Sequence, residues 1–364
     1  MAKISDNDAI YELLDKLDGE GQHEKVLEKI AEVPADDISN KLWFKKIRAL
    51  NGLGRFDEAK REISLLSKRC EDPSESALLY YYLGYTFVQN GSTLKGVECY
   101  YHTKELDPDF ENIQATIDGA MESVEKDLAS AKTSFENLFA DIKNTFDSVK
   151  DKRELTFPEA ANYISYIQAS FITSGMGIRL PFDKPFFECD SDEDKQKLKM
   201  FLEGKFGITD LKSLQQWFGY ERIAPMIDGV DNAMKNNDPM PVDRMSINER
   251  VHFESIQLVL RYLGGLLPEA GVSAWDYNYV IALARIAYAA GVLTKTEFAE
   301  TTIFFTDETT NYFSSWEEFA RSVIIGGFFN GMFETQYDVK YATQFGAVAC
   351  NIFKNNYAQV DWIK

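Results

Sequence analysis

The sequence of 364 residues has little that could serve catalysis, metal binding or disulfide bonding. Its four cysteines form no C-x-x-C pair, and its three histidines lie far apart. No stretch follows the H-E-x-x-H, G-x-S-x-G, G-x-x-x-x-G-K or G-x-G-x-x-G patterns of common catalytic and nucleotide sites. We therefore expect no cofactor, no metal site and no disulfide framework, which fits a reducing compartment.

Long apolar runs and positive charge are also scarce. No run reaches the ~20 apolar residues that cross a bilayer, and the first residues lack the apolar core of a signal peptide. Lys and Arg number 39 against 58 Asp and Glu, for a net charge of −19. Such charge repels phosphate backbones and anionic headgroups, so we expect a cytoplasmic protein that binds neither nucleic acid nor membrane. It would attract a basic protein partner, although acidity also serves solubility.

The first third of the sequence carries a repeat. Gly21, Gly54 and Gly91 are spaced 33 and 37 residues apart, each between two stretches with the apolar spacing of a helix. The best-defined unit is built from Tyr80, Leu83, Gly84, Phe87, Gly96, Tyr100, Thr103 and Pro108. Residues 7–110 therefore resemble three tetratricopeptide repeats, with departures at Gly96 and Thr103, where alanine is usual. The alternative is a plain helical bundle.

The resemblance implies a concave face lined by the first helix of each pair. The positions that it assigns to this face are Tyr11, Asp15, Phe44, Arg48, Asn51, Tyr81 and Tyr85. Aromatic and arginine side chains suit peptide recognition, because they bury a large area at low entropic cost. The alternative is that this face docks on the chain's own second domain.

The middle of the chain, residues 111–155, is predicted to be helical and to link two domains. Apolar residues recur at three- and four-residue steps from Ile113 to Phe146, which indicates two consecutive amphipathic helices whose stripe packs into a core. Thr156 and Glu159 have the spacing of a helix start. The acidic stretch 182–194 does not fit a calcium-binding loop, so we expect a solvated acidic loop there.

Residues 156–364 are predicted to form a compact helical domain. Capping-box spacing recurs at Ser246–Glu249, Ser273–Asp276, Thr294–Glu297 and Ser315–Glu318, each before an apolar helical pattern. No series of segments alternates as strands do. The predicted fold class is all-α, with a repeat array at 1–110, linker helices at 111–155 and a helical domain at 156–364.

Part of this second domain resembles a known family. The segments that carry the resemblance are Trp275-Asp276-Tyr277, Leu283-Ala284-Arg285, Tyr288-Ala289-Ala290-Gly291, Glu297, Ser315-Trp316-Glu317-Glu318-Phe319 and Gly326. They are similar to the bacterial domain of unknown function 1266, over about residues 195–357. The resemblance implies a bacterial protein with a helical domain, and it implies no established activity.

Arg285 stands out because its helix is apolar on nearly every face, which predicts a buried guanidinium. A buried guanidinium requires carboxylate or carbonyl partners. Glu254 and Glu297 are the candidate partners on other helices, as is Glu317, whereas Asp276 is out of phase with Arg285 and is predicted to cap its helix with Ser273. This polar cluster is interpreted either as a structural pair that fixes helix register or as an anion or substrate site.

These features together favour a non-enzymatic protein that binds a peptide or partner protein through the repeat groove. Its net charge suggests one specific form of this role, in which the chain neutralises a basic bacterial toxin as an immunity protein. The alternative is an enzyme whose pocket in the second domain uses Arg285 and carboxylates. The sequence determines neither the partner nor the oligomeric state.

Overall fold

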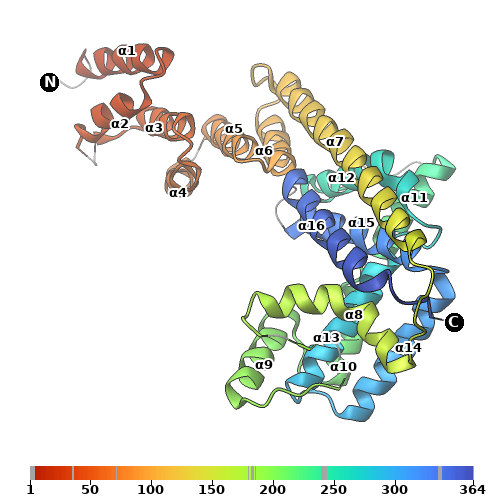
Figure 1. The fold of residues 1–364 in the computed structure, drawn as a ribbon. Helices are drawn as coiled ribbons and strands as arrows, with labels where there is room; N and C mark the ends of the chain where they lie inside the picture. The colour runs from red at the N-terminus through yellow and green to blue at the C-terminus, as the bar shows by residue number, and fades with distance from the viewer. Residues whose placement is uncertain are drawn as a thin grey trace. The chain divides into compact units, whose positions relative to one another are not determined.

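The computed structural model describes residues 5–34, 37–70, 72–178, 180–181, 184, 186–238, 244–334 and 338–363. Within these ranges every regular element is a helix, apart from an isolated bridge between Arg153 and Val360, which confirms the all-α class (Figure 1). The described residues form two compact units. The first comprises Met1–Asp127, Pro241–Ser255 and Phe333–Lys340, and the second comprises Leu128–Met240, Ile256–Met332 and Tyr341–Lys364.

The first unit contains three consecutive helical hairpins (Figure 1). They pair α1 (Ser5–Gly19) with α2 (His23–Ala31), α3 (Asn40–Gly52) with α4 (Phe56–Leu66), and α5 (Pro73–Gln89) with α6 (Thr93–Leu106). Gly21, Gly54 and Gly91 stand in the three turns with φ of 69°, 70° and 89°. Only glycine adopts this left-handed region without steric cost, so the spacing of the three glycines does mark equivalent turns.

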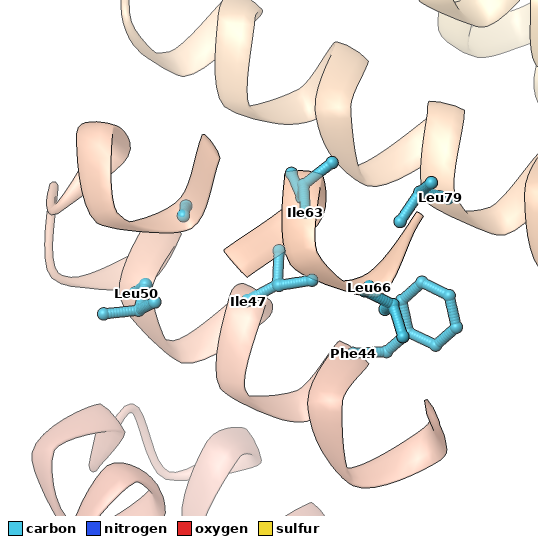
Figure 2. Close-up of a cluster of buried hydrophobic side chains, with 7 residues drawn as sticks. Phe44, Ile47, Leu50, Ile63, Leu66 and Leu79 are labelled. Atoms are coloured by element: carbon cyan, nitrogen blue, oxygen red, sulfur yellow. The ribbon is translucent and has the colours of Figure 1, made fainter. Parts of the chain in front are cut away.

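Apolar side chains join each hairpin to the next. Figure 2 shows one such cluster, in which Phe44 and Ile47 of α3 lie with Ile63 and Leu66 of α4 and with Leu79 of α5. All five are buried. Burying a side chain of this size stabilises a fold by about 1.5–3 kcal/mol. The cluster therefore fixes how the second hairpin stacks on the third.

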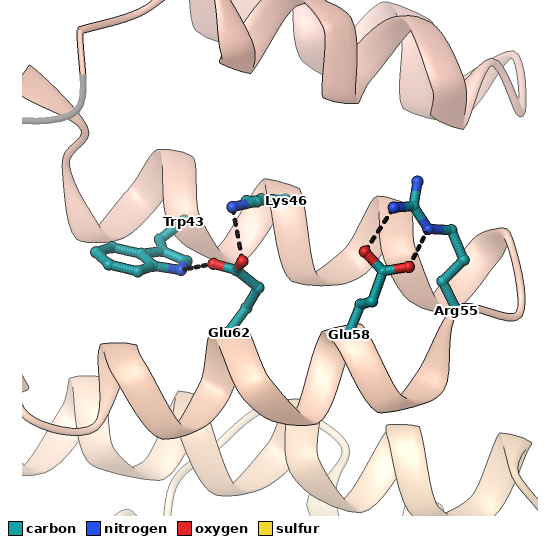
Figure 3. Close-up of polar contacts among 5 residues, drawn as sticks. All are labelled: Trp43, Lys46, Arg55, Glu58 and Glu62. Carbon is teal, nitrogen blue, oxygen red and sulfur yellow. Dashed lines mark hydrogen bonds and ion pairs between the residues drawn. The ribbon is translucent and has the colours of Figure 1, made fainter.

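Polar contacts at the edge of the second hairpin add specificity. The Trp43 indole nitrogen donates to a carboxylate oxygen of Glu62 at 2.7 Å, and Lys46 pairs with the other oxygen at 2.8 Å (Figure 3). Arg55 and Glu58 form a separate bidentate pair with both bonds at 2.6 Å. Because this second pair is exposed, it contributes little to stability.

The middle of the chain forms one helix rather than two. Helix α7 (Ile113–Ser148) is continuous, because the segment has no proline and Gly119 costs a helix only about 1 kcal/mol relative to alanine. Its apolar stripe is buried, as predicted, at Ile113, Ile117, Val124, Leu128, Phe135, Phe139, Ile142 and Phe146.

The second unit is built around α13 (Ser273–Ala289). This helix contacts α8 (Phe157–Ser174), α9 (Asp192–Phe206), α10 (Leu211–Tyr220), α11 (Ala224–Asn236) and α14 (Lys295–Tyr312). The remaining helices are α12 (Ile247–Leu263), a 3-10 turn at Gly264–Leu266, α15 (Trp316–Glu334), α16 (Val339–Ile352) and a π-helical turn at Phe353–Tyr357. Only Ser273 and Tyr277 of α13 are not buried, as expected for a helix that is apolar on nearly every face.

The predicted helix starts have mixed outcomes. Thr156–Glu159, Ser246–Glu249 and Thr294–Glu297 form the expected reciprocal caps. At the fourth box Ser315 accepts the Glu318 N–H, but the Glu318 carboxylate accepts from Ser314 instead. The capping box predicted between Ser273 and Asp276 does not form, so this prediction is wrong. The N-cap of α13 is Val272, and the Ser273 hydroxyl donates to the Ala270 carbonyl.

The acidic stretch is also partly a helix. Its last three residues, Asp192 to Asp194, form the first turn of α9, and Ser191 caps that turn. Carboxylates at a helix N-terminus are stabilised by the helix dipole, which explains why this run of charge begins a helix rather than remaining a loop. Phe182, Asp183 and Pro185 of the predicted loop lie outside the described residues.

Candidate functional site

The first helices of the three hairpins form a continuous row. Helix α1 contacts α3, and α3 contacts α5, while α2 and α4 each pack on the first helix of the following pair. This arrangement is the one expected for a face lined by first helices. We call the side chains of Tyr11, Asp15, Asp18, Lys45, Arg48, Tyr82 and Tyr85 on this row the first-helix face.

Four of the seven residues predicted to face a partner lie on this surface. Asp15 is exposed and forms an ion pair with Lys45. The Arg48 side chain is 53% exposed and Tyr85 is 37% exposed. Tyr11 is half-buried, and its hydroxyl lies 2.5 Å from the Ser39 hydroxyl.

Of the other three predicted residues, two are buried and one is half-buried. Phe44 is 6% exposed in the cluster of Figure 2, and Asn51 is 5% exposed. Tyr81 is half-buried with its ring against Tyr100 and Phe110 at 5.7 and 5.2 Å. The assignment of Phe44 and Asn51 to an open groove is therefore wrong, because both side chains are buried, whereas the assignment of the half-buried Tyr81 stays a prediction.

Arg48 is the centre of a polar network that joins the three first helices. Its Nε lies 2.8 Å from a carboxylate oxygen of Asp18 on α1, and Asp18 is only 9% exposed. The positive charge of Arg48 also acts on Tyr82 of α5 and lowers the pKa of its hydroxyl, although burial dominates and raises that pKa overall. The Tyr82 ring stacks on Phe44 at 5.5 Å. The guanidinium is thus held in place while about half of the side chain stays open to solvent.

Sequence reasoning left Tyr82 out of the site. It lies in the run Tyr80-Tyr81-Tyr82, where composition does not distinguish one ring from the next. Because neighbouring residues on a helix point about 100° apart, a small change in helix phase decides which tyrosine reaches Arg48. The partner could be found only once the packing of α5 against α3 was known.

In the second unit Arg285 is buried as predicted, at 1% exposure. It donates to the backbone carbonyl of Pro181, which is a carbonyl partner rather than a carboxylate. Burial lowers the pKa of Arg285 to about 10. Its Nε and one terminal nitrogen have no hydrogen-bond partner within the part of the chain that the structure describes.

The carboxylates proposed as partners of Arg285 have other contacts. Glu254 accepts from the Tyr101 hydroxyl at 3.0 Å and from Arg250 at 2.8 Å. Glu297 accepts from the backbone and hydroxyl of Thr294 as the cap of α14. The four-residue cluster of Arg285, Glu254, Glu297 and Asp276 therefore finds no support in the contacts of its members.

Asp276 caps a helix other than its own. Its two carboxylate oxygens accept the backbone N–H groups of Ile223 and Ala224, at 3.1 and 3.0 Å, at the start of α11. The side chain is 5% exposed, and burial outweighs these hydrogen bonds, raising the pKa of Asp276 to about 6. Asp276 also lines a cavity of about 590 Å³.

Other residues of the recognised motifs form the core. Trp275 and Trp316 are 4% and 3% exposed, as expected of core anchors. Gly326 lies against Trp275 so closely that a Cβ added to it would be 2.4 Å from the Trp275 Cβ. This close approach explains the need for glycine at that position of α15.

The described residues hold neither a metal-binding cluster nor a helix that could span a membrane. Within the described ranges no three His, Cys, Asp or Glu side chains are grouped so that they could hold a metal ion. No described helix is long and apolar enough to cross a membrane.

Comparison with known proteins gives one match. The model of a family described as a protein of unknown function (DUF1266) matches residues 88–362. No curated protein and no solved structure matches the chain significantly. The matched range begins near the end of α5 and includes all of α13.

Proposed function

The chain belongs to this DUF1266 family, and from that premise we propose that it is a non-enzymatic interaction protein whose first-helix face binds a peptide or partner protein. The observation that carries the proposal is Arg48. Its guanidinium is held by the ion pair with Asp18 on α1 and interacts electrostatically with Tyr82 on α5, yet the side chain is 53% exposed. An arginine held in one geometry loses little entropy on binding, which is the property of an interface hot spot.

We also propose that the hairpins are tetratricopeptide repeats. Equivalent turns at Gly21, Gly54 and Gly91 and the continuous row of first helices support this assignment. Repeats of this type present their first helices to partners. The face then offers Tyr85 as an exposed aromatic contact, and the free donors of Arg48 suit backbone carbonyl groups of a bound segment.

We propose more specifically that the chain neutralises a basic toxin in the cytoplasm of a bacterium. The net charge of −19 favours a basic partner and speeds its encounter. The decisive observation is binding to the basic product of a neighbouring gene, together with restored growth when both are expressed. If that product does not bind, the immunity role is rejected and the test of the face itself is unaffected.

The face is tested with the partner recovered by affinity purification from the native cell. The double variant Tyr85→Ala/Arg48→Lys removes the Tyr85 ring and the planar guanidinium of Arg48, and it keeps the positive charge that neutralises Asp18. We expect affinity for the partner to fall about tenfold or more. The control is Leu65→Ala/Arg61→Lys, a similar change on exposed residues of the second helix α4.

We expect the control to bind within about twofold of the unchanged chain, and both variants to keep its thermal unfolding midpoint to within a few degrees. Equal affinity of the two variants would reject the first-helix face as the binding surface. Isothermal titration with the purified partner provides the affinities.

A further inference from the structure

The second unit contains three neighbouring cavities that are joined by shared lining residues. The first, of about 590 Å³, lies among α11, the start of α13 and the end of α14, and the second measures about 460 Å³. These two share Glu269, Asn311 and Tyr312 as lining residues. The third, of about 220 Å³, shares Trp362 and Ile363 with the second. We call the combined surface the acidic furrow.

The furrow is lined mainly by negative charge. Its acidic residues are Asp228, Asp231, Glu269, Asp276, Glu318, Glu154 and Asp361, and its basic ones are Arg222 and Lys235. Lys235 is already paired with Asp231 at 2.6 Å. The guanidinium of Arg222 lies over the Phe218 ring at 4.9 Å. The surface therefore keeps an excess of uncompensated carboxylates.

Four of these carboxylates have no hydrogen-bond or ion-pair partner among the described residues, and they are distributed along the furrow. Asp228 lies in the first cavity, Glu269 lies where the first and second meet, and Glu154 and Asp361 lie in the third. Asp276 and Glu318, in contrast, are used in helix capping. Asp228 is exposed, and partial burial, followed by the nearby Asp231, raises its pKa, while Lys235 opposes this effect.

Aromatic rings stand beside these carboxylates. Tyr312 is 56% exposed, lines both larger cavities and stacks on Tyr277 with ring centroids 6.1 Å apart. Trp362 lines the second and third cavities, and its ring lies edge-on to the Trp316 ring with centroids 4.6 Å apart. The methylene stem of a lysine or arginine packs on such a ring while its charged end reaches a carboxylate.

From this arrangement we propose that the acidic furrow binds an extended lysine- or arginine-rich segment of a partner protein. The charge of the surface disfavours nucleic acid, and no described group of His, Cys, Asp and Glu can hold a metal ion. One small amine would satisfy one of the four free carboxylates, whereas an extended chain can present several basic side chains at once. This site is in the other unit from Arg48, so it stands whether or not the first-helix face binds a partner.

The test measures fluorescence anisotropy of a labelled peptide with the full chain. The probe alternates arginine and alanine over about eight residues, which spans roughly 26 Å when extended. The furrow variant is Asp228→Asn/Glu269→Gln/Glu154→Gln, which changes no carboxylate used as a helix cap. The matched control is Glu136→Gln/Glu203→Gln/Glu300→Gln, which removes three exposed charges outside the furrow.

We expect the unchanged chain and the control to bind the peptide within about twofold of each other, and the furrow variant to bind about tenfold more weakly or worse. Tyr312→Ala provides a second readout, with affinity reduced about threefold or more at unchanged net charge. Both readouts are compared at low and at physiological ionic strength, because screening weakens exposed charge pairs.

Three outcomes would overturn the proposal. The first is equal loss of binding in the furrow and control variants, since general acidity would then explain the attraction. The second is absence of peptide binding at low ionic strength. The third is competition by spermidine at the affinity of the peptide, which would assign the furrow to small organic cations instead.

Discussion

Gly84 of α5 and Gly96 of α6 meet where the two helices of the third hairpin approach most closely. A Cβ built on Gly84 would lie 2.9 Å from the Gly96 carbonyl oxygen and 2.6 Å from the Tyr100 ring, and one built on Gly96 would lie 2.8 Å from the Gly84 carbonyl oxygen. Each added Cβ would meet the backbone carbonyl oxygen of the other glycine. A backbone atom cannot move aside as a flexible side chain can. The hairpin therefore depends on the lack of a side chain at both positions.

Gly84→Ala is expected to destabilise the first unit by about 1–3 kcal/mol, because the methyl group forces α5 and α6 apart. The control is Gly119→Ala in α7, where a Cβ would meet nothing within 4 Å. Alanine is the better helix former, so the control should be unchanged or more stable by up to about 1 kcal/mol. Urea unfolding followed by circular dichroism measures both; a destabilised control, or an unaffected Gly84 variant, would refute this packing argument.

Asp276 should make stability depend on pH between about 4 and 6. Its pKa is about 6 in the folded chain against an ordinary 3.8, so the folded state holds the proton more tightly. The contribution of Asp276 to the free energy of unfolding is therefore fully present below pH 3.8 and is lost as the pH rises through 6. The total loss is about 3 kcal/mol.

The measurement is the difference in free energy of unfolding between the natural chain and Asp276→Asn across this pH range. Asparagine cannot accept both N–H groups of α11, so it should be the less stable form at pH 4. The difference should shift in favour of asparagine as pH rises to 7. A difference that stays constant with pH would show that the Asp276 carboxylate is not desolvated.

Arg285→Met is expected to leave the second unit equally stable or to stabilise it by about 1–4 kcal/mol. Methionine is unbranched, replaces the apolar stem of arginine and carries no charge, while the guanidinium is 1% exposed and has two nitrogens unpaired among the described residues. Arg285→Ala serves as the contrast, since the cavity that it leaves should cost about 2–5 kcal/mol. Thermal and urea unfolding distinguish the two; a large loss of stability in the methionine variant would show that the guanidinium makes a net favourable interaction.

The prediction of candidate sites from sequence succeeded where local spacing was enough. Exposure of Arg48 and Tyr85 and burial of Arg285 follow from helical phase within one segment. It failed for Phe44 and Asn51, because their exposure depends on how the helices pack. It also could not find the acidic furrow, whose free carboxylates at 154, 228, 269 and 361 are brought together only by the packing of separate helices.

Local sequence determined the helices, the three glycine turns and most helix starts, since backbone preference and capping act over a few residues. Tertiary structure decided the partners of polar groups. It paired Asp276 with the start of α11 rather than with Ser273, and Arg285 with a backbone carbonyl rather than a glutamate. The physical reason is that a buried polar group needs a hydrogen-bond partner, and packing decides which partner lies within reach. The spacing of residues along the chain does not show which groups from different helices come that close.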